Sequence, residues 1–197
     1  MIAIVETGIA NTASVLRALR RVAPDPAVVV LASDPAMLGE ASHLVLPGVG
    51  AFEAGMEAIG GLRDVIVEHL DADRPFLGIC LGMQLLCRAS EESPGVEGLG
   101  VLDARVARLP GAGRVPHLGW NRVDGIAGVF ESGHAYFANS YRVSSIPDGW
   151  RASMVTHDEP FVAALSRGAA LACQFHPELS GAWGASLLRQ WIGGRAC

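Results

Sequence analysis

Hydrophobic residues in the first half of the chain occur in short runs, separated by stretches with the spacing of amphipathic helices. Such alternation is typical of βαβ units, in which buried parallel strands are joined by helices. The runs that predict strands cover residues 2–5, 27–32 and 43–46, and a fourth ends at Ile79. The first half of the sequence therefore predicts a parallel sheet.

Two stretches between these runs predict helices. The first has Val15 and Leu19 on one face. Either Asn11 or Thr12 can cap its start. The second stretch covers residues 52–72 and contains two adjacent glycines near its middle, which predict a break into two helices.

The apolar runs in the second half of the chain, after Pro94, are shorter and separated by turns rich in Gly, Pro or Asp. They predict antiparallel or mixed strands, at residues 101–109, 135–143, 151–156 and 161–166. A last strand at residues 170–175 precedes a closing helix that Ser180 can cap. The apolar stripe of this helix is expected in the core and consists of Trp183, Leu187, Leu188 and Trp191.

These elements together predict an α/β fold with three layers, in which an open, mixed but largely parallel sheet carries helices on both faces. The chain of 197 residues has no internal repeat and no long linker, so we expect a single domain, residues 1–197. A composition of 50% hydrophobic and 18% charged residues is that of a globular protein rather than a disordered one.

The charge pattern excludes two classes of partner. The net charge of −5 is mild and the basic residues are scattered, which suits neither nucleic acid nor an anionic membrane surface. The N-terminus lacks the pattern of a signal peptide, and no stretch has the roughly 20 apolar residues of a membrane span. We therefore expect a cytoplasmic protein.

The four cysteines, Cys80, Cys87, Cys173 and Cys197, form no CxxC pair and no Cys/His spacing of a zinc site. The sequence therefore predicts no disulfide framework, no metal and no cofactor. Each cysteine is by default a small buried apolar residue, and a catalytic role has to be argued for each position.

Cys80 lies in GICLGMQ, directly after the fourth predicted strand and between Gly78 and Gly82. A sharp strand-to-helix turn exposes its central side chain and requires small neighbours two positions away. The N-terminus of the following helix favours a thiolate there. The Leu81 amide can bind an oxyanion, and Gln84, one turn on, can contact a substrate. The alternative is a buried cysteine whose glycine neighbours only permit close packing.

A thiol nucleophile needs a histidine base that is held in place by a third group. Of the six histidines, His176 is the best candidate, because it ends an apolar strand and Glu178 follows just beyond Pro177. The alternative is a solvated turn without a catalytic role. His157 is expected in a solvated turn, with metal or substrate contact as the other possibility.

Residues 47–50, PGVG, follow the third predicted strand and can supply a second oxyanion donor. Gly48 and Gly50 flank Val49, so that its peptide can approach a ligand closely and reorient. A plain strand-to-helix turn is the alternative. Phosphate binding is not indicated, because the loop lacks both the GK[ST] ending and the GxGxxG spacing.

PGVGAF, GICLGMQ and QFHPE, in this order and at these separations, resemble the class I (triad) glutamine amidotransferase family over nearly the whole chain. Within it, the N-terminal residues, PHLGWN and YFANSY are similar to the glutaminase subunits of imidazole glycerol phosphate synthases. The resemblance implies a flavodoxin-like fold and a heterodimer with a (β/α)8 barrel cyclase subunit in histidine biosynthesis. The chain would hydrolyse L-glutamine through a cysteine thioester and deliver ammonia to that partner.

The resemblance also implies roles for individual residues. Cys80 attacks the glutamine amide, His176 moves protons and Glu178 orients His176. The amides of Val49 and Leu81 face the oxyanion. The positions that match the glutamine pocket are Gly48, Gly50, Gln84, Ser140 and Tyr141, and those that match the partner interface are Asn11, Trp120, Asn121 and Leu179.

Five positions depart from the family's pattern. In the first loop, Glu6, Thr7 and Ala10 replace the Asp, Tyr and second Gly of the usual DYGxGN. Asn139 replaces the histidine of YFxHSY, and Leu179 replaces a lysine that can form a salt bridge. These departures leave the catalytic residues intact and concern the partner, so a subunit that serves a different acceptor synthase is an alternative.

Two alternatives come from other classes of protein: a free-standing cysteine amidase or peptidase, and a non-catalytic interaction module. Gln84 and PHLGWN argue against the first, and the intact Cys80, His176 and Glu178 argue against the second.

A glutaminase that released ammonia freely would lose it by diffusion. We therefore also expect the Val49 peptide to become competent only when the partner is docked.

Overall fold

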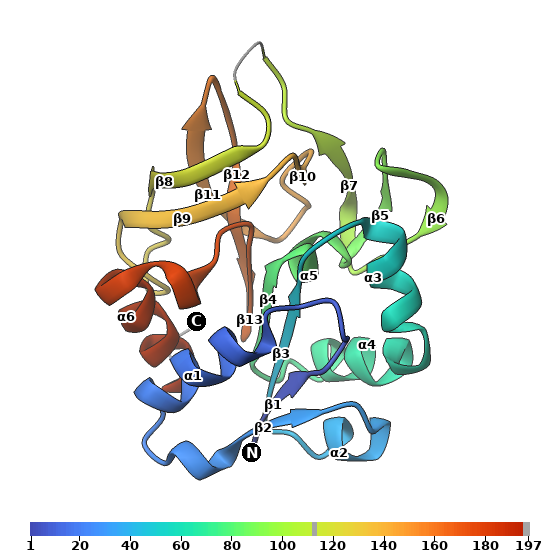
Figure 1. Ribbon diagram of the computed structural model, residues 1–197, viewed down its shortest axis with the longest axis vertical. Coiled ribbons are helices and arrows are strands. Elements are labelled where there is room, and N and C mark those ends of the chain that lie inside the picture. Colours follow the sequence, from blue (N-terminus) through green and yellow to red (C-terminus); the bar gives the residue numbers. More distant parts are fainter. Residues whose placement is uncertain (112–113, 195–197) are drawn as a thin grey trace.

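Figure 1 shows the computed structural model of the chain, which describes residues 1–111 and 114–194. Its centre is a seven-stranded sheet in the order β11-β12-β13-β4-β3-β1-β2. The strands from β13 to β2 are parallel, and β12 and β11 extend the sheet in antiparallel fashion at one edge. The strands are β1 (Ile2–Val5), β2 (Val29–Ala32), β3 (His43–Gly48), β4 (Phe76–Cys80), β11 (Arg151–His157), β12 (Glu159–Arg167) and β13 (Ala170–Cys173).

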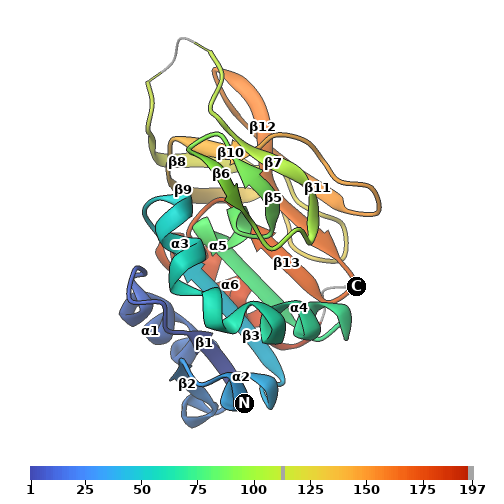
Figure 2. The same ribbon diagram turned by 90° about the vertical axis from the view of Figure 1, so that its right-hand side faces the viewer.

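Helices cover both faces of this sheet, as Figure 2 shows. On one face, the apolar residues of α1 (Thr12–Val22) and α6 (Gly181–Ile192) share a core with Ile2 and Ile4. On the other face, Ala3 and Val5 share a core with residues of three further helices, α2 (Pro35–Gly39), α3 (Phe52–Ala58) and α4 (Arg63–Asp71). Because β1 side chains alternate between the two faces, one strand serves both cores. The predicted three-layer α/β fold is confirmed.

Two smaller sheets lie beyond the carboxyl ends of the parallel strands (Figure 1). One has the order β10-β7-β5-β6, and the other is the antiparallel pair β8-β9. Their strands are β5 (Cys87–Ser90), β6 (Ser93–Glu97), β7 (Leu102–Arg108), β8 (His117–Val123), β9 (Gly133–Asn139) and β10 (Tyr141–Val143). Short elements complete the chain: α5 (Leu81–Gln84) and the 3-10 turns Pro26–Val28, Gly60–Leu62 and Pro177–Leu179.

Several element boundaries differ from the sequence predictions. The strand expected at residues 135–143 is divided at Ser140 into β9 and β10, and β5, β6 and β8 were not predicted. The run expected to form a strand at residues 27–32 begins instead with a 3-10 turn, because the Asp25 carboxylate accepts a hydrogen bond from the Ala27 amide (2.9 Å). Local side-chain hydrogen bonds therefore override the apolar pattern there.

One of the two predicted helix caps is confirmed and the other is wrong. Asn11 Oδ1 accepts a hydrogen bond from the Ser14 amide (3.2 Å) at the start of α1. Ser180 stands at the start of α6, but its hydroxyl donates to the His176 carbonyl (2.6 Å) and accepts from the Tyr136 amide (3.0 Å). Ser180 therefore fixes the segment that carries His176 against β9.

Gly82 is required by the close contact between β3 and α5. A Cβ atom at this position would overlap the Leu46 carbonyl oxygen, which belongs to a central strand and has no room to move. We expect Gly82→Ala to lower the free energy of unfolding by about 3 kcal/mol. Urea denaturation measures this change. Gly61→Ala is the control, since a Cβ there meets no atom within 4 Å; a similar loss in both variants would contradict the packing argument.

Candidate active site

Cys80 occupies a strained backbone turn at the end of β4. Its φ of 54° and ψ of −109° lie in a region that residues with a side chain rarely adopt. Strain of this kind persists only where the surroundings impose it, and it is common at active sites. The residue is 6% exposed. The sharp turn predicted from GICLGMQ is therefore present.

The helix that follows Cys80 is shorter than the sequence suggested. α5 consists of a single turn, Leu81–Gln84, so its dipole is much smaller than that of a full helix. The Leu81 amide is the first of this turn, where an N–H group has no partner within the helix. A thiolate at Cys80 consequently depends on nearby side chains more than on the helix dipole.

His176 and Glu178 form a buried pair next to Cys80. His176 follows β13, and Glu178 lies in the 3-10 turn that begins at Pro177. The His176 Nδ1 and Glu178 Oε1 atoms are 2.8 Å apart, and the two side chains are 8% and 3% exposed. Since Nδ1 is bound to the carboxylate, Nε2 is the ring nitrogen that hydrogen-bonds to Cys80. The three residues expected to act together are thus brought together.

The electrostatics of the site favour a charged imidazole. Burial alone would lower the pKa of His176, but the hydrogen bonds and negative charges of Cys80 and Glu178 outweigh it and raise the pKa to about 10. A protonated imidazole is therefore the expected state of His176 at neutral pH. The other described cysteines differ, since burial raises the pKa of Cys87 to about 12 and raises that of Cys173 as well. Cys197 lies outside the described residues.

The second oxyanion donor expected at Val49 is not in place in this structure. The Val49 amide donates to the Ile9 carbonyl (3.2 Å), so its N–H group is occupied outside the site. β3 runs on through Pro47 and Gly48 and is thus longer than predicted, and Gly50 follows with a φ of 97°. The peptide has to turn before it can face an oxyanion.

Cys80, the predicted nucleophile, lines a cavity of about 470 Å³. Four of the five residues expected in the glutamine pocket line it, and Gly48 does not: it is buried in β3 and packs against Leu81. The lining residues are Val49, Gly50, Ala51, Cys80, Leu81, Gln84, Glu92, Ala138, Asn139, Ser140, Tyr141 and His176. The cavity therefore combines the predicted nucleophile, its base and the predicted substrate contacts.

Gln84 is held by two hydrogen bonds within the protein. Its Nε2 group donates to the Tyr141 carbonyl (3.1 Å) and to Gln174 Oε1 (2.9 Å). Both amide hydrogens are then used, so Gln84 can offer a substrate only its carbonyl oxygen. The carbonyl of Tyr141 also accepts from Asn139 Nδ2 (3.0 Å), and that of Ser140 accepts from the Leu109 amide (2.9 Å).

Gln174 is a site residue that the sequence analysis missed. It is fully buried, and its Nε2 lies 3.6 Å from Cys80 Sγ, within hydrogen-bonding distance of sulfur. The signal in the sequence was its spacing from His176, because residues two apart in an extended segment point to the same side.

The residues expected at a partner interface are distributed unevenly. Trp120 and Leu179 are 57% and 42% exposed, and Asn11 lies on the surface as the cap of α1. Asn121 is instead half-buried, with its Nδ2 donating to the Thr156 carbonyl (2.8 Å).

His157 adjoins the exposed turn at Asp158, as expected, but is itself half-buried. Its ring stacks on His117 with centroids 4.1 Å apart, and its Nε2 contacts the Arg114 carbonyl (2.8 Å). Burial, together with the charge of His157, lowers the pKa of His117 to about 4. Across residues 1–111 and 114–194, no group of three or more His, Cys, Asp or Glu side chains is placed to hold a metal ion.

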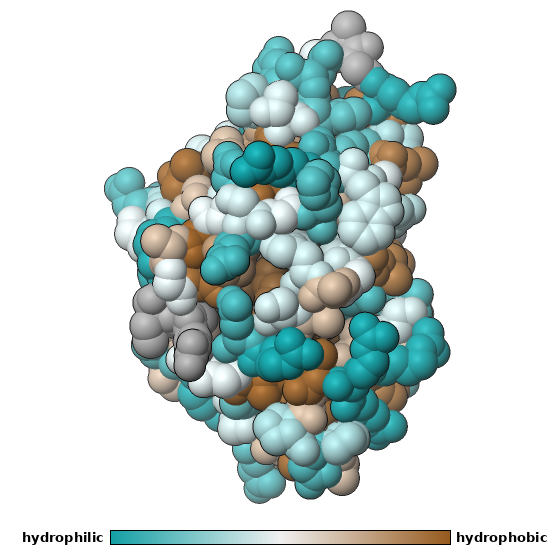
Figure 3. Space-filling view, turned by 90° about the vertical axis from the view of Figure 1, so that its left-hand side faces the viewer, coloured by the Kyte–Doolittle hydropathy of each residue, from teal (hydrophilic) through white to brown (hydrophobic). Residues whose placement is uncertain are grey.

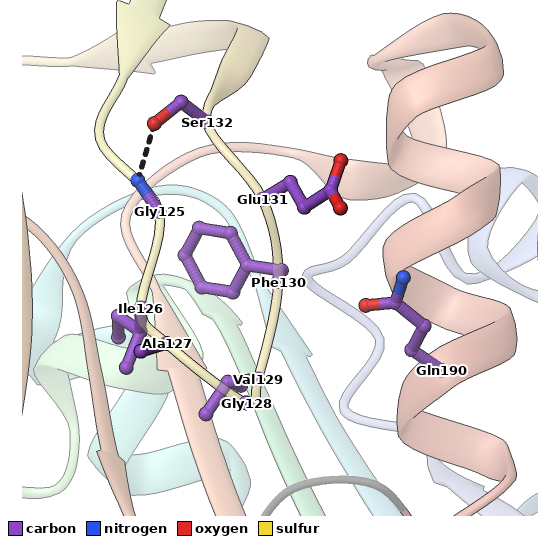
Figure 4. Close-up of a pocket in the computed structure, with 9 residues that line it drawn as sticks. All are labelled: Gly125, Ile126, Ala127, Gly128, Val129, Phe130, Glu131, Ser132 and Gln190. Carbon is purple, nitrogen blue, oxygen red and sulfur yellow. Dashed lines mark hydrogen bonds between the residues drawn. The ribbon is translucent and has the colours of Figure 1, made fainter.

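A second hollow of about 470 Å³ lies between the β8–β9 connection and α6 (Figure 4). Phe130, Glu131 and Gln190 line it, and the Gly125 amide donates to Ser132 Oγ across the neck of the loop (2.9 Å). The lining contains no cysteine or histidine, so the hollow offers no thiol nucleophile and no imidazole base.

Comparison with known proteins identifies the family of the chain. The sequence profile described as Glutamine amidotransferase class-I matches residues 3–192. The chain belongs to the class-I glutamine amidotransferase family. A Methanothermobacter thermautotrophicus protein named "Imidazole glycerol phosphate synthase subunit HisH" is 39% identical over 197 residues, covering 98% of each chain. A Thermococcus kodakarensis protein of the same name is 41% identical, covering 97% of this chain and 98% of its own.

The architecture of this glutamine amidotransferase also matches a solved structure. The structure titled "Crystal structure of glutamine amidotransferase" superposes with a TM-score of 0.79 over the full length of both chains, at 20% sequence identity. At that identity the likeness concerns the fold alone. It agrees with the largely parallel sheet and the helices on both faces.

Proposed function

We propose that this chain is the glutaminase subunit of an imidazole glycerol phosphate synthase, which hydrolyses L-glutamine to glutamate and ammonia. The observation that carries the proposal is the strained Cys80 beside the buried His176–Glu178 pair. The relatives, at about 40% identity over nearly their full length, support the choice of subunit.

The proposed reaction proceeds through a thioester. Cys80 Sγ attacks the side-chain amide carbon of glutamine, and the carbonyl electrons form an oxyanion near the Leu81 amide. The intermediate collapses, and ammonia leaves with a proton from His176. Water then attacks the thioester carbonyl while His176 takes its proton, and the Cys80 thiolate is expelled as glutamate forms. Glu178 keeps the imidazole oriented in both halves.

Glutamine is proposed to enter the cavity with its side-chain carbonyl at the Leu81 amide. The free carbonyl oxygen of Gln84 is placed to accept a hydrogen bond from an N–H group of the substrate. Gly50, Ser140 and Tyr141 supply backbone walls to the same cavity. Val49 contributes the second oxyanion donor once its amide leaves the Ile9 carbonyl.

A partner surface is proposed around Trp120 and Leu179. Leu118 and Trp120 point outward from β8 and are 63% and 57% exposed. The Trp120 ring packs against Tyr136, whose backbone forms an isolated antiparallel β-bridge with His176. On the side view in Figure 3, hydrophobic residues are interspersed with hydrophilic ones, with no continuous apolar face. No helix in the described residues is long and apolar enough to cross a membrane. We propose a (β/α)8 barrel cyclase as the partner, in a heterodimer that receives the ammonia.

The experiment compares steady-state glutamine hydrolysis by the isolated chain and by the chain mixed with a barrel subunit and its ligand. Since the Val49 amide is bound to Ile9, we expect a turnover number about 10-fold or more higher in the complex. Equal turnover in both samples would contradict the proposal that the Val49 amide becomes an oxyanion donor only when the partner is docked. Absence of glutamate in both would contradict the function itself.

A further inference from the structure

The sulfur of Cys80 has a second neighbour besides His176. The Nε2 atom of Gln174 lies 3.6 Å from Sγ. We propose that Gln174 is a further catalytic residue, whose side-chain N–H donates a hydrogen bond to the Cys80 thiolate and stabilises it for attack. This inference rests on Cys80 being the nucleophile of the proposed function.

The orientation of the Gln174 amide is fixed by the protein. The backbone carbonyl of Tyr141 can only accept hydrogen bonds, so Gln84 presents its NH₂ group to it (3.1 Å). The second hydrogen of that group points to Gln174 (2.9 Å), which must then present its oxygen. The NH₂ group of Gln174 is left for Cys80. A rotated Gln174 amide would set NH₂ against NH₂ and oxygen against the thiolate.

The location of Gln174 strengthens this hydrogen bond. Its side chain is 0% exposed, and its backbone amide donates to the Ala163 carbonyl (2.8 Å), which holds the residue in place. A hydrogen bond to a charged acceptor in a dry interior is stronger than one in water. The single turn of α5 supplies only a small dipole. The Gln174 side chain therefore contributes a larger part of the stabilisation of the Cys80 thiolate.

The chain of hydrogen bonds also joins the substrate wall to the nucleophile. It runs from the Tyr141 carbonyl through Gln84 and Gln174 to Cys80 Sγ. Gln84 therefore has two roles. It offers its carbonyl oxygen to the cavity, and it fixes the orientation of the Gln174 amide, with the NH₂ group toward Cys80. Loss of Gln84 is expected to weaken the donor at the sulfur in addition to substrate binding.

The test is Gln174→Met, which keeps the length of the side chain and removes the donor. We expect kcat/KM for glutamine to fall about 10- to 100-fold, mainly through kcat. Alkylation of Cys80 by iodoacetamide, followed by peptide mass spectrometry, separates this effect from substrate binding. The pH at which its rate reaches half the plateau should rise by about one unit. Gln190→Met, in α6, is the matched control and should change neither measurement.

A role limited to packing would lower stability without moving the pH profile of alkylation. A folded Gln174→Met variant with the wild-type alkylation profile would therefore overturn the proposal. Alkylation needs no glutamine, so failure of the glutaminase function would be visible separately, as missing hydrolysis in the wild type.

A second measurement uses the wild-type sequence, in case the variant does not fold. The chain has three glutamines, Gln84, Gln174 and Gln190, so ¹⁵N-glutamine labelling gives three side-chain NH₂ signals. Alkylation of Cys80 removes the thiolate acceptor. We expect the Gln174 signal to shift most and the Gln190 signal to stay. An unchanged Gln174 signal would overturn the proposal.

Discussion

Replacing Cys80 with alanine is expected to reduce glutamine hydrolysis by at least about 10,000-fold, the scale of losses when a covalent nucleophile is removed. The reason is that no other described group can form the thioester. Cys87 and Cys173 are buried, and burial raises the pKa of both thiols, so they stay protonated. Release of glutamate, followed with a coupled dehydrogenase assay, measures the effect.

Cys87→Ala is the matched control for this substitution. Cys87 is the first residue of β5, is fully buried and does not line the cavity. We expect its activity to stay within about twofold of wild type, with a loss of stability of about 1 kcal/mol from the small cavity created. If Cys80→Ala kept some hydrolysis and the added Cys87→Ala change abolished it, Cys87 rather than Cys80 would be the nucleophile.

Replacing His176 with glutamine is expected to lower kcat/KM by about 1,000-fold, because proton transfer to the leaving ammonia and from the attacking water both depend on it. Glutamine retains a hydrogen-bonding group of similar reach and cannot carry the proton. His134→Gln, at an exposed position on β9, is the control and should behave as wild type. Wild-type kinetics in His176→Gln would contradict the assignment.

The pH dependence of stability offers a second measurement on the same variant. The pKa of His176 is raised from 6.5 to about 10 in the folded chain, so folding favours the protonated imidazole. The resulting stabilisation is complete below pH 6.5 and is lost as the pH rises through about 10. Urea unfolding across this range should show the difference between wild type and His176→Gln shrinking with pH. A difference that grows with pH would contradict the ion pair.

The parts of the fold that could be predicted are those with strong local signals. β1 and the helix capped by Asn11 appear where the sequence places them, since a short apolar run and an amide before a periodic stretch specify them directly. The glycines around Cys80 predicted the strained turn, because Gly82 leaves no room for a side chain. His176 and Glu178 were identified by their position after a strand.

The features that escaped prediction depend on contacts distant in sequence. Ser180 looked like a cap because its neighbours are local, but its hydroxyl is used by Tyr136, 44 residues away. Val49 was expected to become competent only when the partner is docked, but the sequence could not show that its amide is held away by the Ile9 carbonyl in another loop. Gln174 was missed because only the histidine and glutamate of QFHPE were considered. Its role depends on a hydrogen bond from Gln84 (2.9 Å), which is distant in the sequence.

The central claim is that one ionised sulfur, at Cys80, performs the chemistry with His176 beside it. A glutamine analogue with an electrophilic side chain, incubated with the native protein and followed by intact and peptide mass spectrometry, tests this most directly. We expect a single adduct, on Cys80, which forms in wild type, forms much more slowly in His176→Gln and is prevented by excess glutamine. An adduct on any other cysteine, or wild-type labelling that glutamine does not slow, would contradict it.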